Sequence, residues 1–279
     1  MRTSRAIFLE LNDCIIRVIY YLVCQLFNHL SIHKRLFMRN IRNHFAVRVP
    51  AFLLLLLFLL ASCSVSKKYT KEATSKWEKD IINFEQLDKS VKDPENAILF
   101  AGSSSIRLWS TLREDVAPYP VIQRGFGGSR FSDLAVYAKR IIYPHQFRAL
   151  VIFEANDITG GKADKTPAEV VKLFGEIVKT VRKKYKDQPI LLFEITPTKS
   201  RWAVWPIVKQ TNQLLKESCS KMHNTYFIET ASAYLTQDGQ PRTELFIKDM
   251  LHQNHDGYTI WGNLVRKKLD EVLQQGATK

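Results

Sequence analysis

The sequence predicts a three-layer α/β domain built on a parallel sheet. Five short runs rich in aliphatic and aromatic residues are each bounded by Gly, Pro, Asn or Asp, which is typical of strands. Longer stretches with apolar residues at three-to-four spacing lie between these runs and indicate amphipathic helices. Because the predicted strands are apolar throughout, they are expected to be buried on both faces, as in a parallel sheet covered by helices on either side.

Taken in chain order, the predicted elements alternate regularly. The first helix is expected at Ser75–Ser90, where large apolar residues recur at helical spacing. Strands are expected at Ala97–Ala101, Val121–Arg124, Ala149–Phe153, Ile190–Ile195 and Thr225–Ile228. The later helices are expected at Ser132–Ile142, Pro167–Tyr185, Pro206–Met222 and Gly257–Leu273. Since ligands bind beyond the carboxyl ends of the strands in such sheets, the loops after the strands are where a site is expected.

The N-terminal part has the pattern of an export signal. An apolar run, Ala51–Leu60, follows a basic stretch and leads into Ala61, Ser62 and Cys63. A cysteine directly after two small residues predicts a lipoprotein signal, with residues 1–62 removed and Cys63 carrying lipid. A short polar tether, 63–72, and one folded domain, 73–279, are then expected. The alternative is an uncleaved membrane anchor, although the apolar run is shorter than the roughly 20 residues that a span needs.

A second methionine bears on where translation starts. Met38 stands where a signal peptide of ordinary length would begin, so residues 1–37 are interpreted as a misassigned start. The signal predicts export to the bacterial cell envelope and anchoring of the protein by its lipid, with the outer membrane as the expected location. Whether the protein would face the periplasm or the outside is left open.

Charge and cysteine usage narrow the function class. The formal net charge is +14, and lysine-rich helical faces such as Lys179–Lys186 are usually solvated surfaces. No recognisable nucleic-acid module accompanies this charge, so nucleic acid is not an expected partner. Of four cysteines, only Cys219 lies in the predicted domain, which excludes an intrachain disulfide framework there. No His-rich or Cys-rich ligand spacing is visible, and no metal or other cofactor is expected.

Three of the loops after strands carry residues suited to ester chemistry. The first contains Ser103, Ser104 and Ser105, any of which is a chemically competent nucleophile, although serine is also a common helix cap. The second holds Gly125-Phe126-Gly127-Gly128, where glycines permit either close approach of an amide to a ligand or an ordinary tight turn. In the third, the carboxamide of Asn156 can donate to a developing oxyanion or bond to the local backbone.

An acid and a histidine occur together near the C-terminus. Three-residue spacing places Asp249 and His252 on one side of a turn or helix start. A carboxylate in that position can orient the imidazole, while the other ring nitrogen acts as base for a serine. His255 is the rival base, but the residue three before it is His252 and not an acid.

These four segments, in this order, resemble those of the SGNH hydrolases, the family that includes GDSL esterases and lipases. The resemblance covers about Ala97 to Leu273 and implies a flavodoxin-like fold with five parallel strands. It also implies serine esterase activity on a carboxylic ester. The roles that it implies are a nucleophile and oxyanion amide at Ser104, further oxyanion donors at Gly128 and Asn156, and an acid–base pair at Asp249 and His252.

Two positions depart from the family pattern. Ser103 stands where the family usually has aspartate, so a carboxylate that could brace the loop is missing. Glu154 stands where the family often has glycine, and its carboxylate is expected near the site, where it would repel an anionic substrate or bind a sugar hydroxyl. These two departures affect the expected substrate more than the expected mechanism.

The substrate class stays open among three alternatives. Trp109, Trp202 and Trp205 either form sugar-stacking surfaces, line an acyl pocket or pack in the core. The first favours deacetylation of carbohydrate or of other small acyl esters, and the second favours a lipase or lysophospholipase. A catalytically silent, lipid-anchored glycan-binding module is the third alternative.

Overall fold

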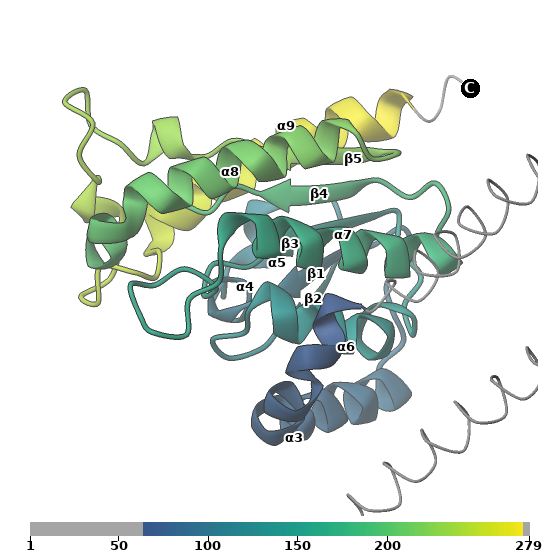
Figure 1. Ribbon diagram of the computed structural model, residues 1–279. Helices are drawn as coiled ribbons and strands as arrows, with labels where there is room; N and C mark the ends of the chain where they lie inside the picture. Colours follow the sequence, from purple (N-terminus) through teal and green to yellow (C-terminus); the bar gives the residue numbers. More distant parts are fainter. Residues whose placement is uncertain (1–63, 276–279) are drawn as a thin grey trace, which may run out of the picture. The chain divides into compact units, whose positions relative to one another are not determined.

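Five parallel strands form a single sheet in the order β2-β1-β3-β4-β5 (Figure 1). The computed structural model describes residues 64–275. The strands are β1 (Ile98–Gly102), β2 (Val121–Gly125), β3 (Ala149–Phe153), β4 (Ile190–Phe193) and β5 (Thr225–Ile228). The predicted parallel α/β sheet is therefore confirmed. The expected leader 1–62, the proposed misassigned start 1–37 and Cys63 lie outside the described residues.

Helices cover both faces of the sheet because successive strand side chains point to opposite sides. Ile98 and Phe100 pack into one apolar core, while Leu99 and Ala101 pack into the other. On one side lie α6 (Phe131–Ile142), α7 (Pro167–Lys184) and α8 (Trp205–Ser220), with α3 (Thr70–Ser90) packed on α6. On the other lie α4 (Ser104–Arg107), α5 (Leu112–Asp115) and α9 (His255–Gln275). Figure 1 views the sheet with α7 and α8 in front and α9 behind.

Four 3₁₀ helices, none of them predicted, complete the described part: η1 (Val65–Tyr69), η2 (Lys199–Val204), η3 (Ala231–Ala233) and η4 (Thr243–Leu245). The short helices α4 and α5 were not predicted either. Such pieces are too short to produce a repeating apolar pattern, so apolar spacing does not predict them. Within residues 64–275, no helix is both long and apolar enough to cross a membrane.

The fourth strand ends earlier than predicted because a side chain hydrogen-bonds to the backbone groups that a neighbouring strand would otherwise pair with. The fourth strand was expected to reach Ile195 but ends at Phe193. The carboxamide of Asn212 accepts from the Ile195 amide at 3.0 Å and donates to its carbonyl at 2.9 Å. Both backbone groups are thus satisfied without a strand neighbour, and the chain is free to turn away from the sheet.

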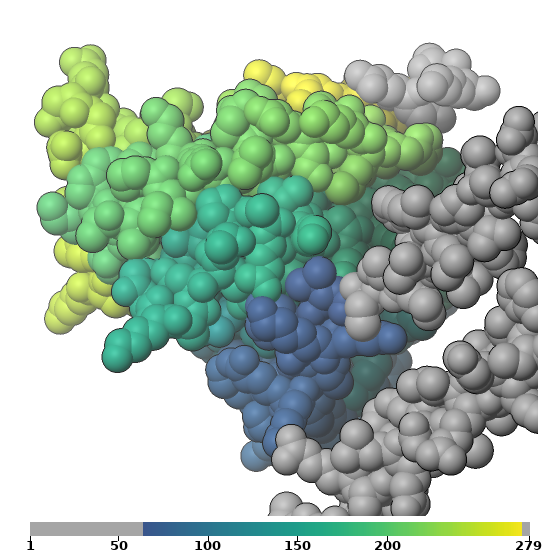
Figure 2. Space-filling model, viewed as in Figure 1, coloured from purple at the N-terminus to yellow at the C-terminus, as the bar shows by residue number. Residues whose placement is uncertain are grey.

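The segment after Cys63 is part of the fold and does not form the expected polar tether. Ser64 Oγ donates to Glu176 of α7 at 2.6 Å, and the amides of Val65 and Ser66 donate to the same carboxylate. Tyr69 donates to Glu169, about two helical turns earlier in α7. Figure 2 shows the segment from residue 64 to residue 90 packed against the surface of α6 and α7. Polar residues that would suit a tether here serve to hold η1 on α7.

Candidate active site

The first loop of the site depends on a glycine at the end of β1. Gly102 has φ +142°, and a Cβ added there would lie 2.0 Å from the Phe153 carbonyl oxygen. Glycine therefore allows β1 to run close enough to β3 for the Ser103 amide to donate to that oxygen at 3.0 Å. The chain then turns into α4, whose first residue is Ser104. As a first helical residue, Ser104 has a backbone amide that is not needed for the hydrogen bonds within α4.

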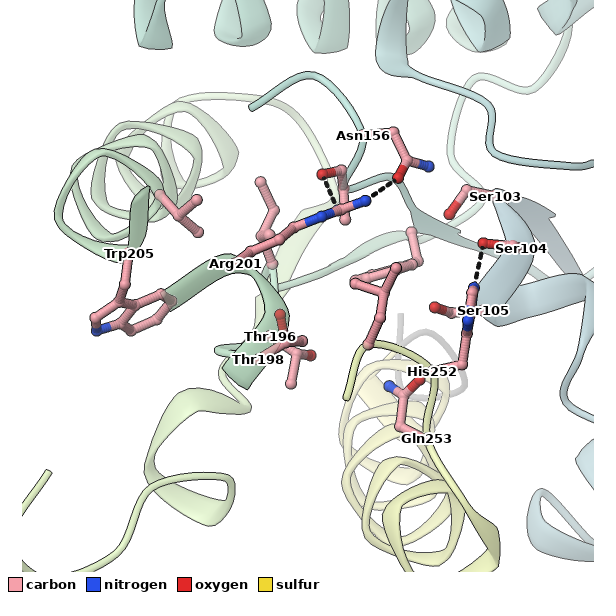
Figure 3. Close-up of a pocket in the computed structure, with 15 residues that line it drawn as sticks. Ser103, Ser104, Ser105, Asn156, Thr196, Thr198, Arg201, Trp205, His252 and Gln253 are labelled. Atoms are coloured by element: carbon pink, nitrogen blue, oxygen red, sulfur yellow. Dashed lines mark hydrogen bonds between the residues drawn. The ribbon is translucent and has the colours of Figure 1, made fainter. Parts of the chain in front are cut away.

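Ser104, His252 and Asp249 form a continuous chain of hydrogen bonds. His252 Nε2 lies 2.8 Å from Ser104 Oγ, and His252 Nδ1 lies 2.6 Å from Asp249 Oδ2. Figure 3 marks the contact between His252 and Ser104 with a dashed line. A carboxylate can only accept, so the proton of the neutral ring belongs on Nδ1. Nε2 is then left as an acceptor directed at the Ser104 hydroxyl, which is the arrangement that a general base requires.

The backbone around Asp249 fixes this carboxylate. Asp249 Oδ1 accepts from the amides of Leu251 and His252 at 2.9 and 3.0 Å. Met250 has φ +56°, so the chain makes a tight turn between the acid and the base, and α9 begins only at His255. Burial alone would raise the pKa of Asp249, but the His252 ring and the two amides outweigh it and hold this pKa below its ordinary value. The carboxylate is thereby kept ionised near neutral pH.

The rival residues lie in other positions. Ser103 and Ser105 also border the cavity but are 1% and 7% exposed, and within residues 64–275 neither hydroxyl bonds to His252. His255 is exposed at the start of α9. The geometry therefore favours Ser104 over both neighbouring serines and His252 over His255.

Gly128 and Asn156 lie side by side next to this chain. A Cβ added at Gly128 would be 3.8 Å from Asn156 Nδ2, in ordinary contact. The preceding glycine, Gly127, has φ +42°, and a Cβ there would lie 2.0 Å from Trp77, so this turn accepts only glycine without rearrangement. Asn156 Nδ2 donates to the Ser129 carbonyl at 2.8 Å. Ser104 and Asn156 thus both border the cavity, and Gly128 lies in contact with Asn156.

Arg201 is a site residue that the sequence analysis missed. It lies in η2, beyond β4, and borders the cavity. Its Nη1 donates to the Ala155 carbonyl at 2.7 Å and its Nη2 to Asn156 Oδ1 at 2.5 Å (Figure 3). Burial lowers the pKa of Arg201, although arginine stays charged in proteins. The only signal in the sequence was its position in the loop after the fourth strand, where a site is expected.

Glu154 lies elsewhere than expected. Its side chain is fully buried, and it is not among the residues that border the cavity. Ser129 Oγ donates to it at 2.9 Å, while Asp157 lies nearby in an ion pair with Lys165 at 3.0 Å. Burial first, and then the charge of Asp157, raise the pKa of Glu154 well above its ordinary value. Glu154 therefore neither repels a substrate nor binds a sugar, because it braces the loop from inside the protein.

The cavity beside Ser104 is small. Its volume is about 30 Å³, and one water needs roughly 10–15 Å³ on this measure. Residues of four chain segments and of the start of α8 border it: Ser103, Ser104, Ser105, Phe153, Ala155, Asn156, Ile195, Thr196, Thr198, Arg201, Trp205, Val208, Leu251, His252 and Gln253. The mixture of apolar walls and a few convergent polar groups is typical of a small-molecule site.

The tryptophans divide between the core and the site. Trp109 is fully buried and stacks on Tyr258 with ring centroids 5.2 Å apart, so it is a core residue and does not contact a sugar. Trp202 and Trp205 are half-buried and stack on each other, with ring centroids 5.9 Å apart and ring planes 13° from parallel. Of these three, only Trp205 borders the cavity.

No metal site accompanies these residues in the described part of the chain. Between residues 64 and 275, no three His, Cys, Asp or Glu side chains come together in a way that could hold an ion. All the polar groups that meet at the cavity are serine, threonine, amide, imidazole or guanidinium groups.

The chain is similar in sequence to a known family and similar in fold to several solved structures. A family model described as the GDSL-like lipase/acylhydrolase family matches residues 99–260. No curated protein sequence matches the chain. A structure from Streptococcus pneumonia, described provisionally as a platelet activating factor, has a TM-score of 0.62 and 22% identity, covering 73% of this chain and 97% of its own.

Two further structures share the fold. A GDSL-like lipase from Bacteroides thetaiotaomicron has a TM-score of 0.57 and 13% identity, covering 68% of this chain and 97% of its own. A carbohydrate esterase family 3 protein from Talaromyces cellulolyticus has a TM-score of 0.51 and 12% identity, covering 64% of this chain and 98% of its own. At these identities the likeness concerns the arrangement of helices and strands.

Proposed function

Because the chain belongs to the GDSL-like lipase/acylhydrolase family, we propose that it is a serine esterase that hydrolyses carboxylic esters by acyl transfer. The observation that carries this proposal is the hydrogen-bonded chain from Ser104 Oγ through His252 to Asp249. The hydroxyl, the imidazole and the carboxylate each have the partner that nucleophilic catalysis requires.

In the proposed mechanism, His252 Nε2 takes the proton of Ser104 Oγ as this oxygen attacks the ester carbonyl. Asp249 stabilises the imidazolium that forms. The amides of Ser104 and Gly128 and the carboxamide of Asn156 donate to the oxyanion of the tetrahedral intermediate. His252 then protonates the leaving alcohol, and water, activated by the same ring, releases the acyl group as a carboxylic acid.

The acyl group that fits is short. A cavity of about 30 Å³ holds two or three water-sized groups at roughly 10–15 Å³ each, which is enough for an acetyl group. Trp205, half-buried beside the cavity, offers an aromatic surface of the kind on which sugar rings stack. We therefore favour acetyl esters of carbohydrates, or other short acyl esters, over the long acyl chains of a lipase or lysophospholipase.

The test is hydrolysis of p-nitrophenyl esters of increasing chain length by the domain from residue 64 to residue 279. Ser104→Ala and His252→Ala are expected to nearly abolish turnover, while Asn156→Ala is expected to lose about 100- to 1000-fold because one oxyanion donor is removed. Activity that falls beyond acetyl supports a short-chain esterase, whereas activity that rises with length supports a lipase. Equal activity in Ser104→Ala and the wild type would refute the mechanism, and glycan binding without any turnover would favour a silent binding module.

We propose further that the protein is a lipoprotein of the cell envelope, attached through Cys63 to the outer membrane. The support is the order of basic residues, apolar run and small residues that ends at Cys63. Radiolabelled palmitate is expected to be incorporated into the full chain and not into Cys63→Ala. Equal labelling of both, or a full chain that fractionates with the cytoplasm, would contradict this.

A further inference from the structure

Arg201 lies beside Asn156 and is held by hydrogen bonds to carbonyl and carboxamide oxygens. Within residues 64–275, no carboxylate is paired with its guanidinium at ion-pair distance, although its surroundings exclude much of the solvent. The guanidinium donates two hydrogen bonds to the loop after β3, one to the Ala155 carbonyl and one to Asn156 Oδ1. The carboxylates of Asp164 and Asp157 act on this charge from beyond ion-pair distance, so the two hydrogen bonds, and not a paired acid, fix the position of the guanidinium.

The partners of Asn156 determine which way its carboxamide points. A guanidinium only donates, so the atom that faces Arg201 must be the amide oxygen. The Ser129 carbonyl only accepts, so the atom that faces it at 2.8 Å must be the amide nitrogen. Figure 3 shows this orientation, with the oxygen toward Arg201 and the nitrogen on the side of Ser103 and Ser104. One N–H of Asn156 is used by Ser129, and the other remains available to a ligand.

Both ends of this arrangement are anchored from within the protein. Ser129 is fully buried, and its hydroxyl donates to the buried Glu154 at 2.9 Å, so the position of its carbonyl is fixed. Arg201 is fixed by its second bond, to Ala155. Asn156 is thus held between a rigid acceptor and a rigid donor.

From this geometry we propose that Arg201 is a positioning residue that keeps the Asn156 N–H directed at the substrate oxyanion. The inference rests on the proposed esterase mechanism. Without Arg201, the carboxamide would keep only its hydrogen bond to the Ser129 carbonyl, so one contact in place of two would oppose rotation about χ2 that moves the remaining N–H away from the oxyanion. Preorganised donors stabilise a transition state because they need no reorganisation as charge develops. Arg201 therefore supports turnover through Asn156 and contributes little to binding of the neutral ester.

Kinetics of Arg201→Ala, Asn156→Ala and the double variant test this proposal. Arg201→Ala is expected to lower kcat by about 10- to 100-fold, less than removal of the donor itself, and to leave KM within about twofold because ground-state binding is not affected. The double variant is expected to match Asn156→Ala, since residues that act through one another are not additive. Guanidinium added to the buffer is expected to restore part of the activity of Arg201→Ala.

The matched control is Arg182→Lys. Arg182 also donates to backbone carbonyls, those of Tyr185, Gln188, His223 and Asn224, but it lies away from the cavity. Its conservative replacement is expected to leave kcat unchanged, even if the unfolding midpoint falls. Losses that add in the double variant, or an Arg201→Ala variant with wild-type kcat, would overturn the proposal.

A measurement that needs no turnover separates this proposal from the esterase mechanism. The side-chain amide signals of Asn156 can be identified in nitrogen-resolved NMR spectra by their absence in Asn156→Ala. In Arg201→Ala these two signals are expected to shift and broaden as the carboxamide begins to rotate, and in Arg182→Lys they are expected to stay in place. Signals unchanged in Arg201→Ala would overturn the positioning role even if the wild type hydrolysed no ester, and signals that shift would support it in that same case.

Discussion

Replacing Asp249 by asparagine tests how the acid acts on the base. Asp249 Oδ1 accepts from the amides of Leu251 and His252, while Oδ2 faces His252 Nδ1. In Asp249→Asn, the one remaining oxygen is expected to stay with the two backbone amides, because turning the NH₂ group toward them would lose two hydrogen bonds at about 0.5–1.5 kcal/mol each. The NH₂ group then faces His252 Nδ1, which must become an acceptor.

The consequence for catalysis is a change of tautomer. With Nδ1 accepting, the ring proton moves to Nε2, 2.8 Å from Ser104 Oγ, and Nε2 can no longer take the serine proton. A wrong tautomer of this kind costs about 10⁴-fold in turnover, which corresponds to about 5.4 kcal/mol of transition-state free energy. Asp249→Ala is expected to retain more activity than Asp249→Asn, because the side chain is 43% exposed and water can occupy its place without imposing the wrong tautomer.

The assay is kcat for p-nitrophenyl acetate at pH 7 in the wild type and these two variants. Asp256→Asn serves as the control, since Asp256 is exposed in the first turn of α9 and removal of its charge leaves the Ser104–His252 pair intact. An Asp249→Asn variant within about tenfold of the wild type, or one more active than Asp249→Ala, would refute the reasoning about the tautomer.

Three further predictions concern stability and reactivity. The pKa of Glu154 is higher in the folded than in the unfolded state, so the unfolded state loses this proton first as pH rises. The free energy of unfolding is therefore expected to fall above about pH 4.3, by up to about 1.4 kcal/mol per pH unit. Glu154→Gln is expected to flatten this part of a plot of unfolding free energy against pH. Burial raises the pKa of Cys219 to about 12, so in the domain from residue 64 onward this thiol is expected to react with Ellman's reagent only after unfolding. Gly127→Ala is expected to lower the free energy of unfolding by about 1–3 kcal/mol, because its φ of +42° is strained for alanine and the methyl group would overlap Trp77.

Each of these has its own control. Glu217→Gln removes an exposed carboxyl of α8 and is expected to leave the pH dependence unchanged, and equal slopes in Glu154→Gln and the wild type would contradict the burial argument. Rapid labelling of Cys219 in the folded domain would mean that α8 opens locally or that the thiol is accessible. Gly239→Ala tests conformation alone, since Gly239 has φ +75° with nothing near its Cβ position; a loss as large as that of Gly127→Ala would show that Trp77 contributes nothing.

Local pattern was enough to predict the layers of the fold. Strand runs such as Ala149–Phe153 were predicted to the residue, because a buried parallel strand is apolar along its whole length. The long helices were located to within a few residues by their apolar spacing, as with α7 at Pro167–Lys184. The end of β4 was not predicted, since the Asn212 side chain replaces a strand partner of Ile195 from 17 residues away in sequence.

Short motifs were enough to predict the residues of the site, but not how these residues come together in space. Ser104 and His252 are 148 residues apart in sequence and meet because α4, which follows β1, and α9, which follows His252, pack on the same side of the sheet. The sequence by itself could offer Ser103 and Ser105 as equal nucleophiles. Distance and direction, which depend on the packing of whole elements, distinguish Ser104 from them.

Repeating local pattern in the amino-acid sequence was sufficient for three properties: alternating strands and helices, the placement of polar residues in loops at one edge of the sheet, and the order of the family motifs. Only the tertiary structure decided which polar groups face the cavity. It placed Glu154 inside the protein, Trp109 in the core and Arg201 against Asn156. The physical reason is that burial and hydrogen-bond partners are set by contacts between segments distant in sequence, and no local spacing encodes them.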